Sequence, residues 1–184
     1  MATARIFCIV SMLFLSGIPG PYTASAQSTV QNNYVQKLDT KDLEGTWYIV
    51  QSTAKAWTGK GITHVMCNFQ CQSGFLKADY TYELQGKSHE LHAIDKTSGP
   101  SAMKESRDKG VFTIRHTWYV VAMGDNRQWI VLYYGRKLLG RESISVLCKS
   151  PVPTNSDSTG INKVLTENYF LQAKSKKIKA IPAH

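Results

Sequence analysis

The sequence has no hydrophobic run long enough to cross a membrane. The single long apolar run, residues 6–18, is itself too short to span a bilayer. It is followed by Ala24-Ser25-Ala26, the small-x-small pattern at which signal peptides are cleaved. We therefore predict a signal peptide over residues 1–26. The mature chain, residues 27–184, is expected to be soluble and either secreted or held in the lumen of the secretory pathway.

Cysteine is scarce, and Asn-x-Ser/Thr sequons are absent, so N-glycosylation is not expected. Removing the signal peptide with Cys8 leaves Cys67, Cys71 and Cys148, an odd number. On a regular strand Cys67 and Cys71 would lie about 13 Å apart, too far for a disulfide. In an oxidising compartment we therefore expect one of these two cysteines to pair with Cys148.

Acidic residues are few: 13 Asp and Glu oppose 22 Lys and Arg, which gives a formal net charge of +9. This balance favours anionic surfaces or ligands. Four lysines form a basic tail, Lys174, Lys176, Lys177 and Lys179. The tail is suited to an anionic membrane surface or a protein partner, although such runs are most often only solvated. Aromatic residues are not interleaved with the basic ones, so no nucleic-acid partner is expected.

The sequence also lacks histidines or cysteines at the spacing of known metal-binding motifs. His89 and His92 are the nearest approach to a metal motif, but on a strand they point to opposite faces. The helical zinc motif has a different spacing. We predict neither a metal nor a cofactor.

Short β-type segments separated by turn residues fill most of the mature chain. The segment over residues 75–84 alternates clearly, with Leu76, Ala78, Tyr80, Tyr82 and Leu84 on one face. The connection over residues 97–109 is rich in Ser, Gly, Pro and charge, and we expect it to be flexible. The predicted strands cover residues 46–51, 64–72, 75–84, 88–96, 111–115, 117–123, 129–135 and 142–149.

Beyond Pro153 the apolar period changes to that of a helix, with Ile161, Val164, Leu165 and Tyr169 on one face. A short terminal strand is predicted over residues 176–181. Eight sequential strands and one C-terminal α-helix indicate an all-β, up-and-down antiparallel barrel in a single domain. A barrel of eight strands encloses room for one small ligand.

Three motifs in this order resemble those of the lipocalins. Gly45-Thr46-Trp47 matches the first motif, and Asp125 with Trp129 four residues later matches part of the second. At the position of the third motif's arginine the chain has Lys149. The resemblance implies that Gly45, Trp47, Asp125 and Lys149 close one end of the barrel. Lysine lacks the planar stacking fork of arginine, so we expect this closure to be weaker.

Two lipocalin subfamilies resemble the chain most. The segments 118–121 and 130–133 are similar to apolipoprotein-D-like carriers, and the segments 129–136 and 149–156 to the lipocalin domain of violaxanthin de-epoxidase. Those enzymes have an aspartate beside the second-strand cysteine, where this chain has Met66 next to Cys67. The second resemblance therefore supports the fold and not the activity.

The resemblance implies a carrier that binds or sequesters a small hydrophobic ligand, such as a lipid, retinoid, carotenoid or tetrapyrrole, as a monomer or homodimer. The predicted inward-facing ligand contacts are Tyr80, Tyr82, Trp118, Val120, Trp129, Val131 and Tyr133. Two alternatives remain open. Cys67 resembles the reactive thiol of lipocalin-type prostaglandin D synthase and is a weak candidate nucleophile. The barrel can also be filled by its own side chains, with the loops binding a partner.

Overall fold

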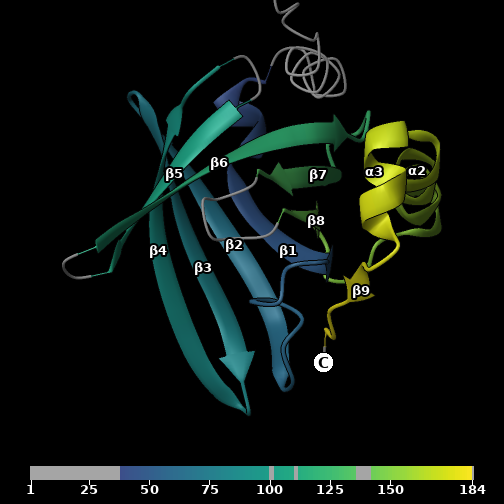
Figure 1. Ribbon diagram of the computed structural model, residues 1–184, viewed down its shortest axis with the longest axis horizontal. Helices are drawn as coiled ribbons and strands as arrows, with labels where there is room; N and C mark the ends of the chain where they lie inside the picture. Colours follow the sequence, from purple (N-terminus) through teal and green to yellow (C-terminus); the bar gives the residue numbers. More distant parts are fainter. Residues whose placement is uncertain (1–37, 100–101, 110–111, 136–141, 184) are drawn as a thin grey trace, which may run out of the picture.

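The computed structural model describes residues 38–99, 102–109, 112–135 and 142–183, so the predicted signal peptide lies outside the described residues. A single antiparallel sheet closes into a barrel of eight strands (Figure 1). Each strand pairs with the next, and β1 closes the ring by pairing with both β8 and β2. The strands are β1 (Gly45–Ser52), β2 (Ile62–Gln72), β3 (Phe75–Leu84), β4 (Lys87–Thr97), β5 (Ala102–Lys109), β6 (Phe112–Met123), β7 (Trp129–Tyr134) and β8 (Ser143–Cys148).

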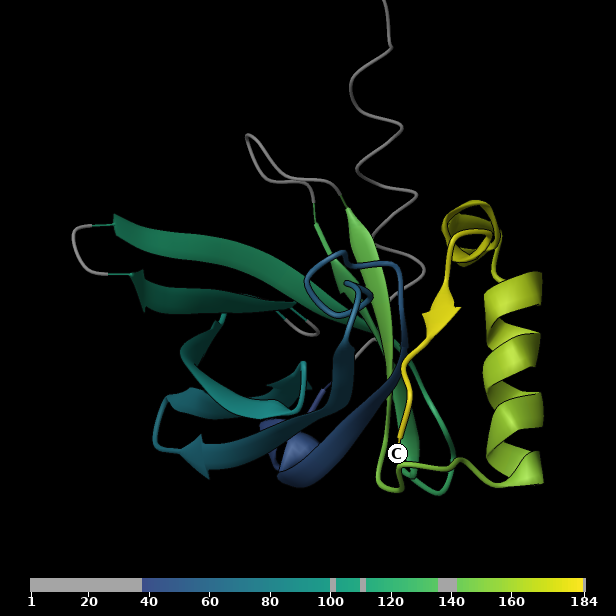
Figure 2. The ribbon, with the colours of Figure 1, turned by 90° about the horizontal axis from the view of Figure 1, so that it is seen from below.

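Helices cover one side of this barrel. The α2 (Asn155–Glu167) and α3 (Tyr169–Ser175) helices lie beside β7 and β8, and β3 and β4 lie on the far side (Figures 1 and 2). The short strand β9 (Lys179–Ala180) pairs with β1 outside the ring. A 3-10 turn, η1 (Thr40–Leu43), precedes β1. Among the described residues, no helix has the length and apolar character needed to cross a membrane.

The predicted fold class is confirmed, with three local corrections. The connection expected to be flexible over residues 97–109 contains β5. The two strands predicted over residues 111–123 are one strand, β6, and the single predicted helix is two, α2 and α3. Strand β5 was missed because the inward side chains Met103 and Glu105 are an apolar and an acidic residue, and this pair gives no apolar alternation.

One end of the barrel is closed by the first and last barrel strands. The indole Nε1 of Trp47 donates a hydrogen bond of 2.6 Å to the Leu43 carbonyl, and both side chains are fully buried. Lys149 Nζ lies 3.9 Å from the centre of the Trp47 ring and donates a hydrogen bond of 2.7 Å to the Glu44 carbonyl. Gly45 has a φ of +98°, a backbone conformation that L side chains rarely adopt. Lys149 therefore covers the Trp47 ring and bonds the backbone just before β1.

The turn between β6 and β7 connects this closed end to η1 and to α2. Arg127 forms an ion pair of 2.6 Å with Asp42 in η1, and Asn126 donates a hydrogen bond of 3.3 Å to Asp157 in α2. Asp157 also accepts hydrogen bonds from Thr154, and these bonds hold the pKa of its carboxyl below the usual value. Asp125, the residue that matches the lipocalin motif, is exposed in this turn.

Two hydrophobic clusters hold the fold, one on each side of the barrel wall. The inner cluster lies inside the barrel and includes Trp47, Cys67, Phe69, Tyr80 and Trp118. The outer cluster lies between the barrel wall and the two helices. Its buried members are Val50, Val121, Trp129, Val131, Tyr133, Ile144, Val146, Cys148, Ile161, Leu165 and Leu171.

Candidate functional site

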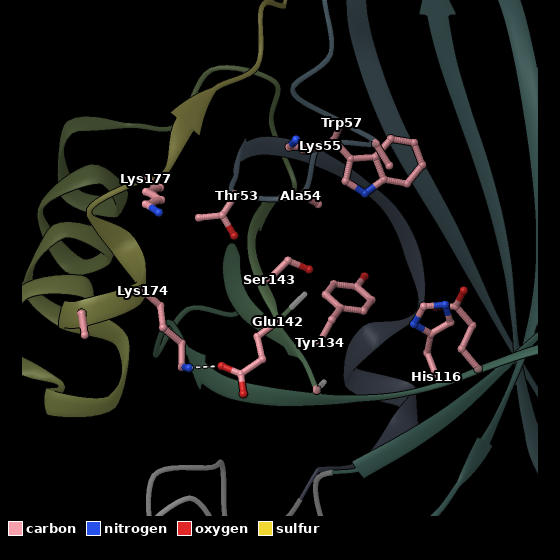
Figure 3. Close-up of a pocket in the computed structure, with 14 residues that line it drawn as sticks. Thr53, Ala54, Lys55, Trp57, His116, Tyr134, Glu142, Ser143, Lys174 and Lys177 are labelled. Atoms are coloured by element: carbon pink, nitrogen blue, oxygen red, sulfur yellow. Dashed lines mark hydrogen bonds and ion pairs between the residues drawn. The ribbon is translucent and has the colours of Figure 1, made fainter. Parts of the chain in front are cut away.

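A cavity of about 760 Å³ lies at the mouth of the barrel, opposite the end closed by Trp47. The segment Thr53–Trp57, which follows β1, forms one wall, and Glu105 in β5 also lines the cavity. His116 in β6 and Tyr134 in β7 line it from the barrel strands (Figure 3). This volume falls in the range of small-molecule sites. The remaining lining residues are Gly135, Glu142, Ser143, Ala173, Lys174 and Lys177.

Aromatic rings stand beside the cavity wall. Trp57 is buried and stacks on Tyr80, with ring centroids 5.6 Å apart, and it meets Tyr82 edge to face at 5.8 Å. Tyr82 in turn stacks on His89 at 5.3 Å. Offset and edge-to-face contacts of this kind hold aromatic side chains in fixed orientations. The loop after β1 is thereby attached to β3, and Trp57 presents a fixed aromatic surface to the cavity.

Two carboxylates are buried on the inner wall of a basic protein. Asp95 in β4 pairs in register with Glu105 in β5, which pairs in register with His116 in β6. Asp95 is 0% exposed and Glu105 is 1% exposed. Asp95 accepts a hydrogen bond of 2.9 Å from the indole Nε1 of Trp118. The register places Asp95, Glu105 and His116 side by side across three neighbouring strands.

Tyr80 lies within the influence of these acids. Burial raises the pKa of its hydroxyl well above the ordinary value, and the neighbouring Tyr134, Cys67, Glu105 and Asp95 raise it further. The phenol therefore stays protonated at physiological pH and remains a hydrogen-bond donor.

Charged groups also lie at the mouth. Lys174 forms an ion pair with Glu142 and lies 4.9 Å from the centre of the Phe170 ring. Lys55, in the loop after β1, and Lys177, after α3, line the same cavity (Figure 3). The residues that line the cavity thus include three lysines, Lys55, Lys174 and Lys177, and two carboxylates, Glu105 and Glu142.

The structure places four of the seven predicted ligand contacts inside the barrel. Tyr80, Trp118 and Val120 are buried in the inner cluster, and Tyr82 packs against it half-buried. Whether these residues contact a ligand stays a prediction.

The inward orientation predicted for Trp129, Val131 and Tyr133 is wrong, because all three belong to the outer cluster. Gly160 in α2 approaches Trp129 so closely that an added Cβ would lie 3.0 Å from its ring. Every residue of β7 from Trp129 to Tyr133 is buried, since one face meets the inner cluster and the other meets the helices. A strand buried on both faces has no polar alternation from which its inner face can be recognised.

The predicted disulfide is not formed. Cys148 belongs to the outer cluster and Cys67 to the inner one, so the barrel wall separates them. Cys71 lies on the inner side of β2, where its sulfur is 3.3 Å from the Thr40 hydroxyl. Cys67, Cys71 and Cys148 form no disulfide with one another.

The weak catalytic candidate Cys67 is fully buried in the inner cluster. Its proposed helper, His64, directs Nδ1 to Thr63 at 3.3 Å and to Glu83 at 3.2 Å. The structure therefore does not bring the His64 imidazole to the thiol as a base. The two histidines of the sequence motif also separate: His89 stacks on Tyr82, whereas His92 contacts Asp79 at 2.7 Å. Across the described ranges, no group of three or more His, Cys, Asp or Glu could hold a metal ion.

Four cavity-lining or acidic residues were not identified from the sequence: Trp57, Asp95, Glu105 and His116. For Asp95 a signal was present, because it shares the apolar face of its strand with Leu91 and Ala93. An acid in such a row is a candidate for a buried functional group. No comparable signal marked Trp57, which lies in the loop between β1 and β2.

Known proteins resemble this chain in structure and not in sequence. No family model matches the sequence, and no curated protein matches it. Among solved structures, insecticyanin from the tobacco hornworm Manduca sexta superposes with a TM-score of 0.70 and 11% identity, over 83% of this chain and 84% of that one. The siderocalin Ex-FABP gives a TM-score of 0.56 and 16% identity, over 78% and 95% of the two chains.

An odorant-binding protein gives a TM-score of 0.56 and 14% identity, over 78% of this chain and 93% of its own. These neighbours are lipocalins, and at such low identities the likeness establishes the fold alone. The chain therefore has the lipocalin fold, as its three motifs indicate.

Proposed function

We propose that the protein is a secreted carrier that binds a small hydrophobic ligand in its barrel and transports or sequesters it. The observation that carries this proposal is the cavity of about 760 Å³ at the mouth of a barrel whose other end is closed by Trp47 and Lys149. Secretion is supported by the predicted signal peptide over residues 1–26.

The structural neighbours support the same function by analogy. One is described as an odorant-binding protein, and the siderocalin is described as functioning through dual ligand specificities. In this chain the driving force would be burial of apolar ligand surface against the aromatic wall near Trp57, worth roughly 25 cal/mol per Å². Tyr134 and the inner-wall polar groups would set the ligand's orientation.

The test is to express the full chain in a secretory host and to examine the secreted product by native mass spectrometry and absorbance. A co-purified pigment or lipid mass would support the carrier and give the ligand class. The product is then stripped of ligand and titrated with the neutral fluorophore 1-anilinonaphthalene. Saturable binding at one site per chain is expected. Absence of any bound molecule together with no saturable binding would contradict the proposal and favour the filled barrel with a protein partner.

The basic tail is proposed as a secondary contact with an anionic membrane surface. Lys174 is engaged by Glu142, whereas Lys176, Lys177 and Lys179 are exposed after α3. Each such lysine near an anionic membrane contributes about 1 kcal/mol. Co-sedimentation with vesicles containing 30% phosphatidylserine should therefore fall when these three lysines are changed to glutamine. Equal sedimentation of the two proteins would remove this contact from the account.

A further inference from the structure

A second cavity, of about 290 Å³, lies next to the first one, and Trp57 lines both of them. The loop between β1 and β2 borders the second cavity together with Lys179, Ala180 and Pro182, in and after β9. Two segments that are far apart in the sequence, the loop after β1 and the chain after α3, therefore both border the mouth of the barrel.

Four exposed lysines lie on these two segments, and we call them the mouth lysines. Lys55 and Lys177 line the first cavity and Lys179 lines the second. Lys60 belongs to the part of the β1–β2 loop that borders the second cavity. Across the described residues, none of the four forms an ion pair. Their ammonium groups are therefore open to a partner in solution.

The acidic residues near the mouth do not cancel this charge. Glu142 already pairs with Lys174, and Glu105 is only 1% exposed. At the mouth end of β3, Glu83 contacts a histidine of β2 at 3.2 Å. Among the residues whose side chains are not described, the sequence contains a single acid, Asp108. Because one acid cannot neutralise four lysines, the surface around the mouth carries a net positive charge.

An anionic bilayer is the partner that suits this arrangement of charge. The mouth lysines are spread over two segments, so an extended anionic surface can meet all of them, whereas one small anion cannot. A bilayer is also the place where a hydrophobic ligand dissolves. Contact between the mouth and the membrane would spare the ligand its unfavourable passage through water.

We propose that the mouth of the barrel docks on an anionic membrane and that the ligand passes directly between the bilayer and the cavity. This inference rests on the proposed carrier function, and it extends the contact of the basic tail to an oriented docking that includes Lys55 and Lys60. Among the described residues, the large exposed hydrophobic side chains are Ile94, Val152 and Tyr169, and none of them lines either cavity. The docking is therefore electrostatic, and salt weakens it.

Transfer kinetics test this route on the secreted full chain. The protein is loaded with 1-anilinonaphthalene and mixed in a stopped-flow instrument with vesicles that contain an energy-transfer acceptor. With 30% phosphatidylserine, we expect the transfer rate to rise in proportion to vesicle concentration and to exceed that for pure phosphatidylcholine at least tenfold. High salt should remove this difference. A rate independent of vesicle concentration and of lipid charge would mean that the ligand travels through water, and it would overturn the inference.

Paired substitutions assign the docking to the mouth. Lys60→Gln together with Lys179→Gln should slow transfer to anionic vesicles at least fivefold, while the affinity for the probe without vesicles stays within twofold. The matched control is Lys96→Gln with Lys104→Gln, an exposed register pair on β4 and β5 that lines neither cavity. It removes the same charge and should slow transfer less than twofold. Circular dichroism verifies that both proteins are folded. Equal slowing by the two pairs would show that only net charge matters, and it would reject the oriented docking.

The docking and the carrier function fail differently in these experiments. A chain that never binds 1-anilinonaphthalene would contradict the carrier function, and the docking proposal would fall with it. Saturable binding with equal transfer to anionic and neutral vesicles would leave the carrier intact and reject only the docking. Binding of the polyanion heparin without faster transfer to anionic vesicles would show that the mouth lysines serve another anion, and it would also reject the docking.

Discussion

The inner and outer clusters are two cores built on the same barrel wall, and they differ in what they contain. The outer cluster is made of apolar and aromatic side chains covered by α2 and α3. Beside the inner cluster lie Asp95 and Glu105, and the space above them opens into a cavity. Close packing without polar groups maximises stability, whereas a cavity and buried charge reduce it. The comparison separates an apolar cluster packed under the helices from an inner cluster that also adjoins buried carboxylates and a cavity, where we propose that the ligand binds.

The largest expected effect is on stability, from truncating the outer cluster. Leu171→Ala removes a fully buried side chain between α3 and the barrel, and it should lower the free energy of unfolding by about 2–4 kcal/mol. Urea denaturation measures this change. Tyr169→Ala, two residues earlier and 82% exposed, is the control and should change stability by less than about 0.5 kcal/mol. A Leu171→Ala protein as stable as the control would show that the helices contribute little to the core.

One tryptophan substitution on each side of the barrel wall separates the effect on stability from the effect on ligand affinity. Trp129→Leu in the outer cluster should cost about 2 kcal/mol of stability and leave the affinity for 1-anilinonaphthalene within twofold. Trp57→Leu should lower that affinity about tenfold, because it removes an aromatic wall of the cavity, and cost less stability. Fluorescence titration and urea denaturation of both variants give the comparison. The opposite pattern would mean that the ligand lies under the helices.

The free energy of unfolding should also depend on pH, because the outer cluster contains the Cys148 thiol. Burial, with a smaller contribution from Asp157, raises the pKa of the Cys148 thiol to about 12. The unfolded chain therefore loses this proton first, near its ordinary pKa, so stability falls as pH rises above about 9 and continues to fall towards pH 12.

The slope attributable to one thiol is about 1.4 kcal/mol per pH unit. Urea denaturation at pH 7 and pH 10 measures it, and the Cys148→Ala protein should lose less stability between these two values than the native chain. The comparison at pH 7 reports only the lost packing and is the reference. Identical pH slopes for the two proteins would show that the thiol is open to solvent.

The smallest expected effect on stability comes from the closed end of the barrel, where Lys149 covers Trp47. Lys149→Ala removes the cation over Trp47 and the hydrogen bond to Glu44, and it should cost about 1 kcal/mol. Lys149→Arg should be at least as stable as the native chain, because its planar guanidinium stacks better on the indole. Thermal denaturation ranks the three proteins. An arginine variant less stable than the alanine variant would contradict the role assigned to this contact.

How far the sequence predicts this molecule depends on which faces are buried. On β3 one face is covered, so the alternation of Leu76, Ala78 and Tyr80 identified strand and inner face together. On β7 both faces are covered, and parity could not show that Trp129 packs under Gly160. The barrel and its closing contacts were predictable because Gly45, Trp47 and Lys149 stand at the positions of the lipocalin motifs.

The candidate site was less predictable for a different reason. Glu105 belongs to a strand whose inner face mixes Met103 with an acid, and Trp57 lies in a loop. Neither position follows a hydrophobic period, since residues that serve a cavity are not selected for packing alone. Only the register of β4, β5 and β6 brings Asp95, Glu105 and His116 together.

The four tryptophans provide the most direct test of the central claim that the ligand binds inside the barrel. Trp57 lines the cavity, Trp118 is buried in the inner cluster, Trp47 lies at the closed end and Trp129 belongs to the outer cluster. Their indole N–H signals can be followed by nitrogen–proton NMR during titration with 1-anilinonaphthalene. We predict that the Trp57 signal shifts most, Trp118 follows, and Trp129 stays in place. A shift confined to Trp129, or no shift at any indole at saturating probe, would contradict the account.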